Sequence, residues 1–179
     1  YYYFNKGISL VSDELYDVLT EYSKTKYPKK KKQTSVGAKV PGKNKVKLPF
    51  MMASMNKIKP EMNALIKWKE KYRGPYVITC KLDGVSALYD GRHHKLYTRG
   101  DGIEGQDISH LLPHLGMENL ETDCVFRGEL IIKKKIFKEK YGDVYANPRN
   151  MVAGLVNKKV NTSDNVLREM LGDINFVVY

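Results

Sequence analysis

The chain has 179 residues and a formal net charge of +11, with 31 lysines and arginines against 20 aspartates and glutamates. This length allows one ordinary domain, or a small unit attached to a larger one. No run approaches the ~20 apolar residues of a membrane span, and the N-terminus lacks the pattern of a signal peptide. Two cysteines are too few for a disulfide scaffold or an all-cysteine zinc site. We therefore expect a soluble, globular, intracellular protein with no membrane association.

The ends of the chain indicate a segment of a longer protein. The sequence begins with Tyr1 rather than an initiator methionine. Its last residues, Phe176–Tyr179, have the apolar composition of a strand interior. We therefore expect the fold to continue beyond Tyr179.

Positive charge is concentrated in one window of the chain. Between Glu21 and Glu61 there is no acidic residue, and twelve lysines fall in this window, four of them consecutive at 29–32. Such a segment attracts polyanions and releases their counterions on binding, and lysine suits backbone contact better than base recognition. A solvated, flexible linker explains the charge equally well, so charge alone leaves both interpretations open.

The first predicted element is a helix over residues 12–23. Ser12 is a suitable N-cap, acidic residues occupy the first turn, and apolar residues recur at helical spacing. Residues 24–48 are punctuated by lysine, glycine and proline and are predicted to form a linker or long loop. A second helix is predicted over residues 61–72, and a Gly-Pro pair follows it.

The hydrophobic period changes from residue 76 onward. β-Branched and aromatic residues predict strands, Asp90-Gly91 marks the turn of a hairpin, and Asn147-Pro148 marks the start of a helix. The predicted strands cover residues 76–80, 85–89, 95–98, 124–126, 130–132 and 175–179, and the predicted helices cover residues 133–141 and 148–157. Strands interleaved with helices around a hairpin indicate an α+β domain with a mixed or antiparallel sheet.

The run Cys80-Lys81-Leu82-Asp83-Gly84 is the most informative stretch for chemistry. A lysine directly after a buried strand is partly removed from water, which favours the neutral amine that acts as a nucleophile. Asp83 lies on the same side of an extended backbone and would orient that amine or bind a sugar hydroxyl. Gly84 permits a turn or the close approach of a ligand. Taken alone, a surface lysine before an Asp-Gly turn is the simpler interpretation.

Three further motifs follow in order along the chain. Arg99 opens a loop with three glycines, which suits contact with phosphates or a ribose. Glu129 interrupts an apolar strand, where a charge needs a partner or a ligand. Arg149 lies at a capped helix start, which binds phosphate well. A flexible turn, an edge-strand side chain and an ordinary helix cap explain each motif separately, and only their joint order favours a nucleotide site.

The ordered set resembles the NAD-dependent DNA ligases. Lys81–Gly84 is similar to their nucleotidyltransferase motif I, and Thr98–Gly102 to the loop after it. Arg127–Glu129 is similar to motif III, and Tyr145–Asn150 to the family's aromatic-Ala-Asn-Pro-Arg-Asn run. Upstream, Tyr2-Tyr3 and Val11–Asp17 resemble the small helical domain with which the family grips the nicotinamide mononucleotide half of NAD. The run Ala153–Lys158 is more similar to the divergent ligases of large DNA viruses than to bacterial ones.

The resemblance implies an α+β fold in two parts. A small helical domain that binds nicotinamide mononucleotide would cover residues 1–33, and a nucleotidyltransferase (adenylation) domain would cover residues 34–179. The second domain would be ATP-grasp-like, with a mixed or antiparallel sheet and flanking helices, and incomplete at its C-terminus. Because the family's later lysine-bearing motifs are absent, we expect residues 1–179 alone to seal nicks poorly or not at all.

The resemblance also implies site residues. Lys81 would be the adenylated nucleophile, with Asp83 and Glu129 beside it in the catalytic site. The residues implied to bind NAD are Tyr2, Tyr3, Asp13, Tyr16, Asp17, Ser54, Met55, Thr79, Lys81, Arg99 and Glu129. The residues implied to contact nucleic acid are Lys29, Lys30, Lys31, Lys32 and Arg149. No side chain is assigned as a direct metal ligand.

The implied activity is the sealing of nicked double-stranded DNA. Lys81 would take AMP from NAD, the AMP would pass to the 5′-phosphate of the nick, and the 3′-hydroxyl would displace it. NAD and magnesium are the implied cofactors, and we expect a monomer acting in DNA replication or repair, in the cytoplasm or at the site of DNA replication. Two alternatives stay open: an ATP-dependent ligase or capping-type nucleotidyltransferase, and a non-catalytic basic nucleic-acid-binding module.

Overall fold

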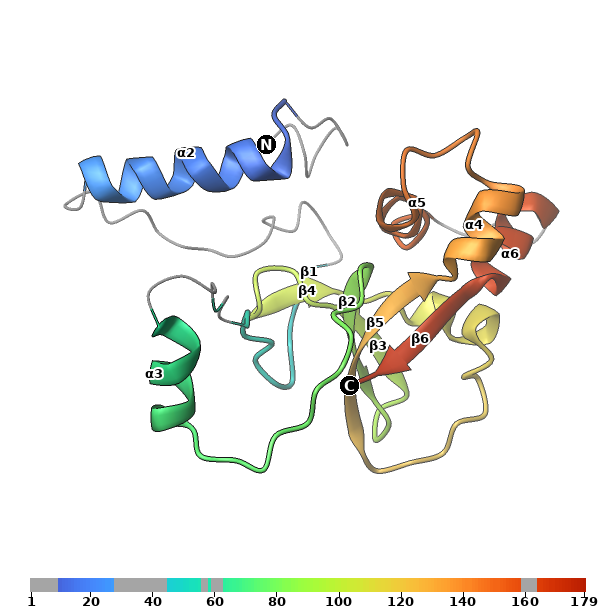
Figure 1. Cartoon of the computed structure of the whole chain (residues 1–179). Coiled ribbons are helices and arrows are strands. Elements are labelled where there is room, and N and C mark those ends of the chain that lie inside the picture. The colour runs from blue at the N-terminus through green and yellow to red at the C-terminus, as the bar shows by residue number, and fades with distance from the viewer. Residues whose placement is uncertain (1–9, 28–44, 56–57, 59–62, 159–163) are drawn as a thin grey trace.

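The computed structural model describes residues 10–27, 45–55, 58, 63–158 and 164–179 (Figure 1). Its centre is a four-stranded antiparallel sheet in the order β3-β2-β5-β6. These strands are β2 (Val85–Asp90), β3 (Lys95–Thr98), β5 (Val125–Ile132) and β6 (Ile174–Val178). A separate antiparallel pair joins β1 (Lys45–Lys47) to β4 (Glu104–Gln106). The predicted α+β class is confirmed, and pairing is antiparallel in all the described strands.

The described part of the chain also contains helices. They are α2 (Asp13–Lys26), α3 (Ala64–Lys71), the 3₁₀ helix η2 (Ser109–Leu115), α4 (Lys134–Lys140), α5 (Pro148–Leu155) and α6 (Asn165–Gly172). Of these, η2, α5 and α6 pack against this sheet. Ser12, Asn147 and Asp164 cap three of them, because each side chain accepts a hydrogen bond from a backbone amide of the first turn. No described helix is long and apolar enough to cross a lipid bilayer.

Alternation along the strands gives the central sheet two different faces. On one face, apolar side chains such as Ala87 and Leu130 pack with residues of η2, α5 and α6 in the main core (Figure 1). On the opposite face, Leu88 packs with Leu48 and Met52 in a second, smaller cluster. Polar side chains, among them Ser86 and Glu129, occupy much of the rest of this second face, which the main core does not cover.

Most predicted elements are confirmed within a few residues. The predicted hairpin is β2-β3, the helices predicted over 133–141 and 148–157 are α4 and α5, and the polar run Arg127–Glu129 lies inside one continuous strand, β5. The sequence did not indicate η2, α6, β1 or β4. β1 lies within the predicted linker 24–48, because its lysine-rich composition resembles a loop until β4 pairs with it.

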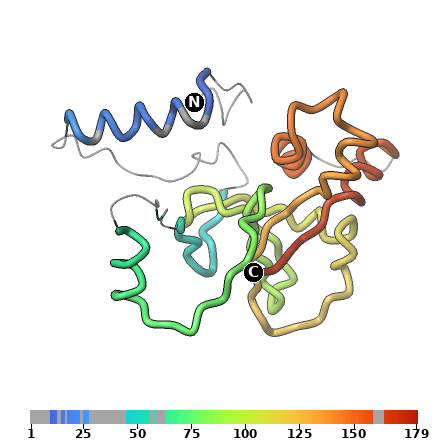
Figure 2. Tube along the Cα trace, viewed as in Figure 1, coloured from blue at the N-terminus to red at the C-terminus, as the bar shows by residue number. Residues whose placement is uncertain are grey.

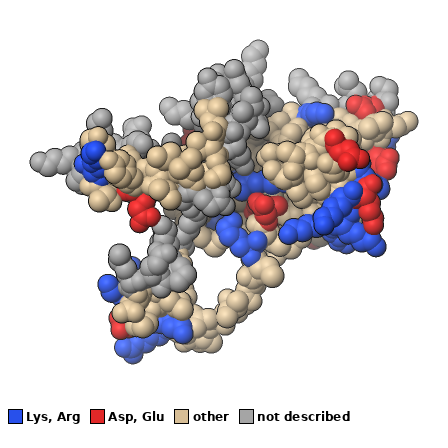
Figure 3. All heavy atoms as spheres, turned by 45° about the horizontal axis from the view of Figure 1, so that its top comes forward, with Lys and Arg blue, Asp and Glu red and all other residues tan. Residues whose placement is uncertain are grey.

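The predicted strand over residues 76–80 is wrong. These residues form no regular secondary structure, and Val77 and Ile78 are 91% and 94% exposed. Figure 2 follows the chain from α3 to β2 along this path, and Figure 3 shows the same stretch as a thin, uncharged arch. β-Branched content favours a strand only where neighbouring strands and side chains pack against it, and no described strand pairs with this arch.

A polar network joins α4 to the end of α6. The Asp173 carboxylate accepts hydrogen bonds from the Tyr141 hydroxyl (2.6 Å) and the Lys140 amine (3.0 Å), and Lys140 also pairs with Glu169 (3.1 Å). Burial acts to raise the pKa of Asp173, but the hydrogen bonds from Tyr141 and Lys140 outweigh burial and hold that pKa below its usual value. Burial, together with the bond to Asp173, raises the pKa of Tyr141 to about 12. The network therefore helps to hold these helices in place against the core.

We expect Asp173→Asn to lower the free energy of unfolding at pH 7 by about 2 kcal/mol, because a charged acceptor is lost from a partly buried network. The difference should shrink in acid. A lowered carboxyl pKa stabilises the fold above the unfolded-state value of about 4, and this stabilisation is lost as the pH falls through the folded-state pKa. Urea denaturation at a series of pH values measures both effects. Glu169→Gln, which touches the same lysine from an exposed position, is the control, and an equal loss in both variants would contradict this assignment.

Candidate functional site

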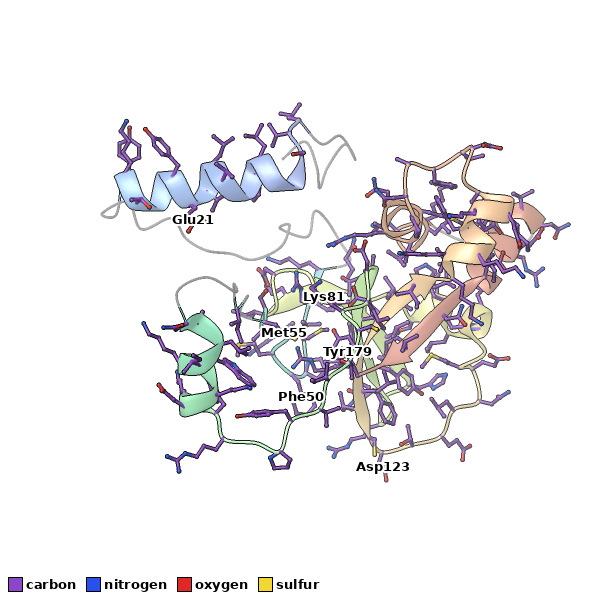
Figure 4. The ribbon with its side chains drawn as sticks, in the orientation of Figure 1. Glu21, Phe50, Met55, Lys81, Asp123 and Tyr179 are labelled. Atoms are coloured by element: carbon purple, nitrogen blue, oxygen red, sulfur yellow. The ribbon has the colours of Figure 1, made fainter. Side chains whose placement is uncertain are left out.

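Lys81 lies where the chain enters β2 (Figure 4). The prediction that it is partly removed from water is wrong, because its side chain is exposed and the segment before it is not a strand. Within the described residues, its amine has no hydrogen-bond or ion-pair partner. The amine is therefore free to meet a ligand that approaches from solvent.

Glu129 joins the two strands next to Lys81. Its side chain lies on β5 directly opposite Ser86 of β2, and the residue is only 8% exposed. One carboxylate oxygen accepts a hydrogen bond from the Gly84 amide (3.2 Å), and the other accepts one from the Ser86 hydroxyl (2.8 Å). A charge in an apolar strand needs such partners, and here both belong to the chain that leads out of Lys81. Each oxygen keeps a further lone pair for a ligand.

Gly84 allows β5 to come this close. A Cβ atom at this position would overlap the carbonyl oxygen of Leu130 and would lie 2.8 Å from Cγ2 of Ile131. The absence of a side chain therefore serves contact between the strands, where the sequence suggested the approach of a ligand. The same close approach brings the Gly84 amide within reach of Glu129.

The loop after β3 is fixed against the same strand. The Arg99 amide donates a hydrogen bond to the Ser86 carbonyl (3.0 Å), and the Arg99 carbonyl accepts one from Gly102 (2.9 Å). Gly100 and Gly102 have positive φ angles of 54° and 96°, which glycine adopts without steric cost. Arg99, Ser86 and Glu129 therefore form a row across the sheet.

The chain between β1 and α3 covers the neighbouring part of this face. Met52 is buried, and its amide donates a hydrogen bond of 2.8 Å to the loop after β3. The guanidinium of Arg127, on β5, lies 3.5 Å from the carbonyl oxygen of Ala53. These contacts hold the next two residues, Ser54 and Met55, near β5, and both are exposed.

Arg149 and Asp83 form an ion pair, with 3.2 Å between Nη1 and Oδ1. Arg149 is the second residue of α5, so the pair joins the start of this helix to the chain after Lys81. The two side chains are 44% and 74% exposed, so solvent screens the pair and it adds little stability. The sequence suggested separate partners, an amine or sugar for Asp83 and a DNA phosphate for Arg149. Because the pair is weak, an anionic ligand can replace Asp83 on Arg149 at small cost.

The remaining predicted residues are not part of this cluster. Thr79 is exposed in the arch before Lys81, and Tyr16 is 62% exposed on α2, the helix that also carries Asp13 and Asp17. In Figure 1, α2 stands apart from the central sheet. Six predicted residues lie outside the described ones: Tyr2, Tyr3, Lys29, Lys30, Lys31 and Lys32.

One residue of the site was not indicated by the sequence. Ser86 has no distinctive pattern around it, and only its register against Glu129 reveals its role. Arg127 did leave a signal, because residues two apart on a strand share a face, and Arg127 therefore faces the same side as Glu129.

A divalent cation is compatible with this arrangement. The described residues contain no group of three or more histidine, cysteine, aspartate or glutamate side chains that could hold a metal. Magnesium, however, keeps several waters and is bound through one or two carboxylates together with substrate phosphates. A buried carboxylate with free lone pairs, as on Glu129, fits that mode of binding.

Comparison with known proteins identifies the family. The family model for the NAD-dependent DNA ligase adenylation domain matches residues 47–172, a range that contains Lys81, Arg99, Glu129 and Arg149. The chain belongs to this family. The resemblance inferred from the order of the motifs is thereby confirmed.

Relatives named as DNA ligases match nearly all of this adenylation-domain chain. One from Acanthamoeba polyphaga mimivirus is 48% identical over 99% of this chain and 28% of its own length. A relative from Invertebrate iridescent virus 6 is 35% identical over 100% of this chain and 28% of its own length. One from Shewanella baltica is 32% identical over 92% of this chain and 27% of its own length. The chain therefore spans just over a quarter of the length of these relatives, and the viral ones are the more similar of the three.

We expect Gly84→Ala to lower the free energy of unfolding by about 3 kcal/mol, because the added methyl group must push apart β2 and the backbone of β5. Thermal and urea denaturation measure this effect. Gly154→Ala, in α5, is the matched control, because its Cβ would meet nothing within 4 Å, and it should be neutral or stabilise by less than about 1 kcal/mol. A Gly84→Ala protein as stable as wild type would show that β5 does not crowd this position.

Proposed function

We propose that Lys81 takes AMP from NAD and that the complete protein passes this AMP to the 5′-phosphate of a nick and seals the strand. The observation that carries the proposal is that a buried glutamate bonds to Gly84, three residues after an accessible lysine, while the Arg99 loop bonds to the strand that follows. Membership of the NAD-dependent ligase family supports NAD as the AMP donor. Because the chain spans 28% of the mimivirus relative, ligation is proposed for the whole protein and lysine adenylation for this part.

The first step joins the Lys81 nitrogen to the α-phosphorus of NAD. The bond between that phosphorus and the bridging oxygen breaks, nicotinamide mononucleotide leaves, and the amine releases a proton. The exposure of Lys81 gives this proton a direct route to solvent. Holding the leaving group opposite the amine would supply the in-line geometry that lowers the barrier.

Two further transfers follow in the complete protein. An oxygen of the nick's 5′-phosphate attacks the lysine-bound AMP, and the Lys81 nitrogen leaves with a proton. The 3′-hydroxyl then attacks that 5′-phosphate, joins the strands, and releases AMP and a proton. Arg99 would stabilise charge that develops on the transferred phosphoryl group.

We assign the adenosine half of NAD to the open face of the sheet. Glu129 would accept a hydrogen bond from a ribose hydroxyl or help to place magnesium, and its free lone pairs support either role. Ser54, Met55 and Thr79 would line the base. Magnesium, when bound with the substrate phosphates, neutralises their charge.

We assign the nicotinamide mononucleotide half to the N-terminal part, residues 1–33, and the adenylation domain to residues 34–179. The residues proposed to hold this half are Tyr2, Tyr3, Asp13, Tyr16 and Asp17. The helix α2 and the exposed ring of Tyr16 support this assignment, because an aromatic face can stack on a planar ring.

Nicked duplex DNA is the proposed partner of a monomeric enzyme that works where DNA is replicated or repaired within the cell. Arg149 would exchange Asp83 for a backbone phosphate, and the weak ion pair between them supports this exchange. Lys29, Lys30, Lys31 and Lys32 would add contacts that do not depend on base sequence. Binding should therefore weaken steeply as salt increases.

The central test is covalent labelling of Lys81. We expect full-length protein incubated with magnesium and NAD radiolabelled in its adenylyl group to acquire one covalent AMP, because the exposed amine is the nucleophile. Lys81→Ala should abolish this label, whereas Lys138→Ala, an exposed lysine on α4, should keep it. Gel autoradiography and mass mapping of the labelled peptide provide the measurement.

Two outcomes of this labelling would favour other functions. Label acquired from ATP and not from NAD would identify an ATP-dependent ligase or capping-type enzyme. Binding of DNA without any covalent AMP from either nucleotide would identify a non-catalytic module.

A second test addresses the N-terminal part. We expect Tyr16→Ala to slow AMP transfer from NAD about 5-fold to 150-fold, because it removes a stacking face worth roughly 1–3 kcal/mol. Sealing of a nick that already carries AMP on its 5′-phosphate should stay normal, because that step does not use the nicotinamide half. Tyr22→Ala removes an exposed tyrosine from the same helix and serves as the control. Equal loss in both reactions, or in both variants, would overturn the assignment.

A further inference from the structure

Ser86 occupies the centre of the row that crosses the open face of the sheet. It lies directly opposite Glu129 on β5, and its carbonyl accepts the hydrogen bond of the Arg99 amide on its other side. It is five residues beyond Lys81, which precedes β2 in the chain. Ser86 therefore contacts the two groups that flank the proposed nucleotide, and it belongs to the strand that follows the proposed nucleophile.

The two hydrogen bonds to Glu129 differ in kind. The bond from Gly84 comes from the backbone, at 3.2 Å, and the bond from Ser86 comes from a hydroxyl, at 2.8 Å. The last side-chain torsion of a glutamate has a broad energy minimum, so one hydrogen bond does not define the plane of the carboxylate. Two bonds, one on each oxygen, do define it.

Glu129 has little else to hold it. Among the described residues, no lysine, arginine or histidine forms an ion pair with its carboxylate. A buried charge without a cation depends strongly on each hydrogen bond that it accepts. The Ser86 hydroxyl is therefore half of the hydrogen bonding that the described protein offers to this charge.

We infer that Ser86 is a positioning residue for adenylyl transfer, and that its hydroxyl turns the free lone pairs of Glu129 toward the ligand. This inference rests on the proposed function. Ser86 touches neither the nucleophile nor the reacting phosphorus and acts only through Glu129. Loss of the hydroxyl leaves one buried oxygen without a partner and frees the carboxylate to rotate.

The test is the rate of AMP transfer from NAD to Lys81 in a single turnover of the full-length protein. Ser86→Ala should lower the rate constant at saturating NAD about 10-fold to 100-fold, the range for one hydrogen bond to a charged group. Ser86→Thr keeps a hydroxyl on the same carbon and should recover to within about threefold of wild type. The double variant Ser86→Ala/Glu129→Ala should be no slower than Glu129→Ala alone, because no side-chain acceptor is left at position 129 for the serine to orient.

Ser109→Ala separates positioning from stability. The Ser109 hydroxyl donates a comparable hydrogen bond of 2.6 Å to the Asp107 carboxylate, away from the open site. Its loss should lower the melting temperature to a similar degree and leave the rate constant unchanged once the protein is folded. A structural role for Ser86 predicts that the two alanine variants behave alike in both measurements.

The outcomes distinguish the two levels of inference. If wild type acquires AMP from NAD and Ser86→Ala does so at the same rate, or if the two substitutions add in the double variant, the role of Ser86 is refuted and the proposed function stands. If wild type acquires no AMP from NAD, both are refuted.

Discussion

A buried carboxylate at the middle of β5 is the constraint on which the site depends. A charge in this position costs several kcal/mol unless hydrogen bonds compensate it, and Glu129 finds two donors, the amide of Gly84 and the hydroxyl of Ser86. Reaching the amide requires β2 and β5 to approach so closely that position 84 has no room for a side chain. The chain at Gly84 is thereby fixed, and Lys81 lies three residues upstream of it. The hydrogen bonds that Glu129 requires thus help to position Lys81, although no contact between the two side chains is needed.

The two faces of the sheet have different roles: one packs in the core and the other carries the candidate site. One face buries its apolar side chains under η2, α5 and α6, which gives the strands a rigid support. The other face receives contributions from distant parts of the chain, namely the segment after β1 and the loop after β3. Backbone hydrogen bonds, together with the one from the Arg127 guanidinium to Ala53, hold Ser54, Met55 and Arg99 around the strands that carry Glu129. In such a site the residues on strands, such as Glu129, are held rigidly. The exposed side chains of Ser54 and Met55 can adjust to a ligand.

The chain as a whole is positively charged, whereas the charges close to Lys81 are partly balanced. The chain carries a net charge of +11, which favours association with a polyanion over long distances. Close to Lys81, however, the positive charge of Arg149 is balanced by Asp83 in an exposed pair. A screened pair of this kind exchanges partners readily, so Arg149 can give up Asp83 for a phosphate. The arch before Lys81 is exposed, with Val77 and Ile78 in solvent, so the proposed nucleophile is held from one side only, by the chain that leads into β2.

The sequence by itself determined the family, the α+β class, the β2-β3 hairpin and the identity of Lys81, Arg99, Glu129 and Arg149 as candidate residues. These follow from local patterns: β-branched runs, turn residues, helix caps and motifs whose order is specific in combination. Only the tertiary structure decided that residues 76–80 are not paired, that Ser86 supports Glu129, and that Arg149 meets Asp83. Each of these depends on which distant segment lies beside a residue, and strand register and long-range packing leave no signal at short spacing along the chain.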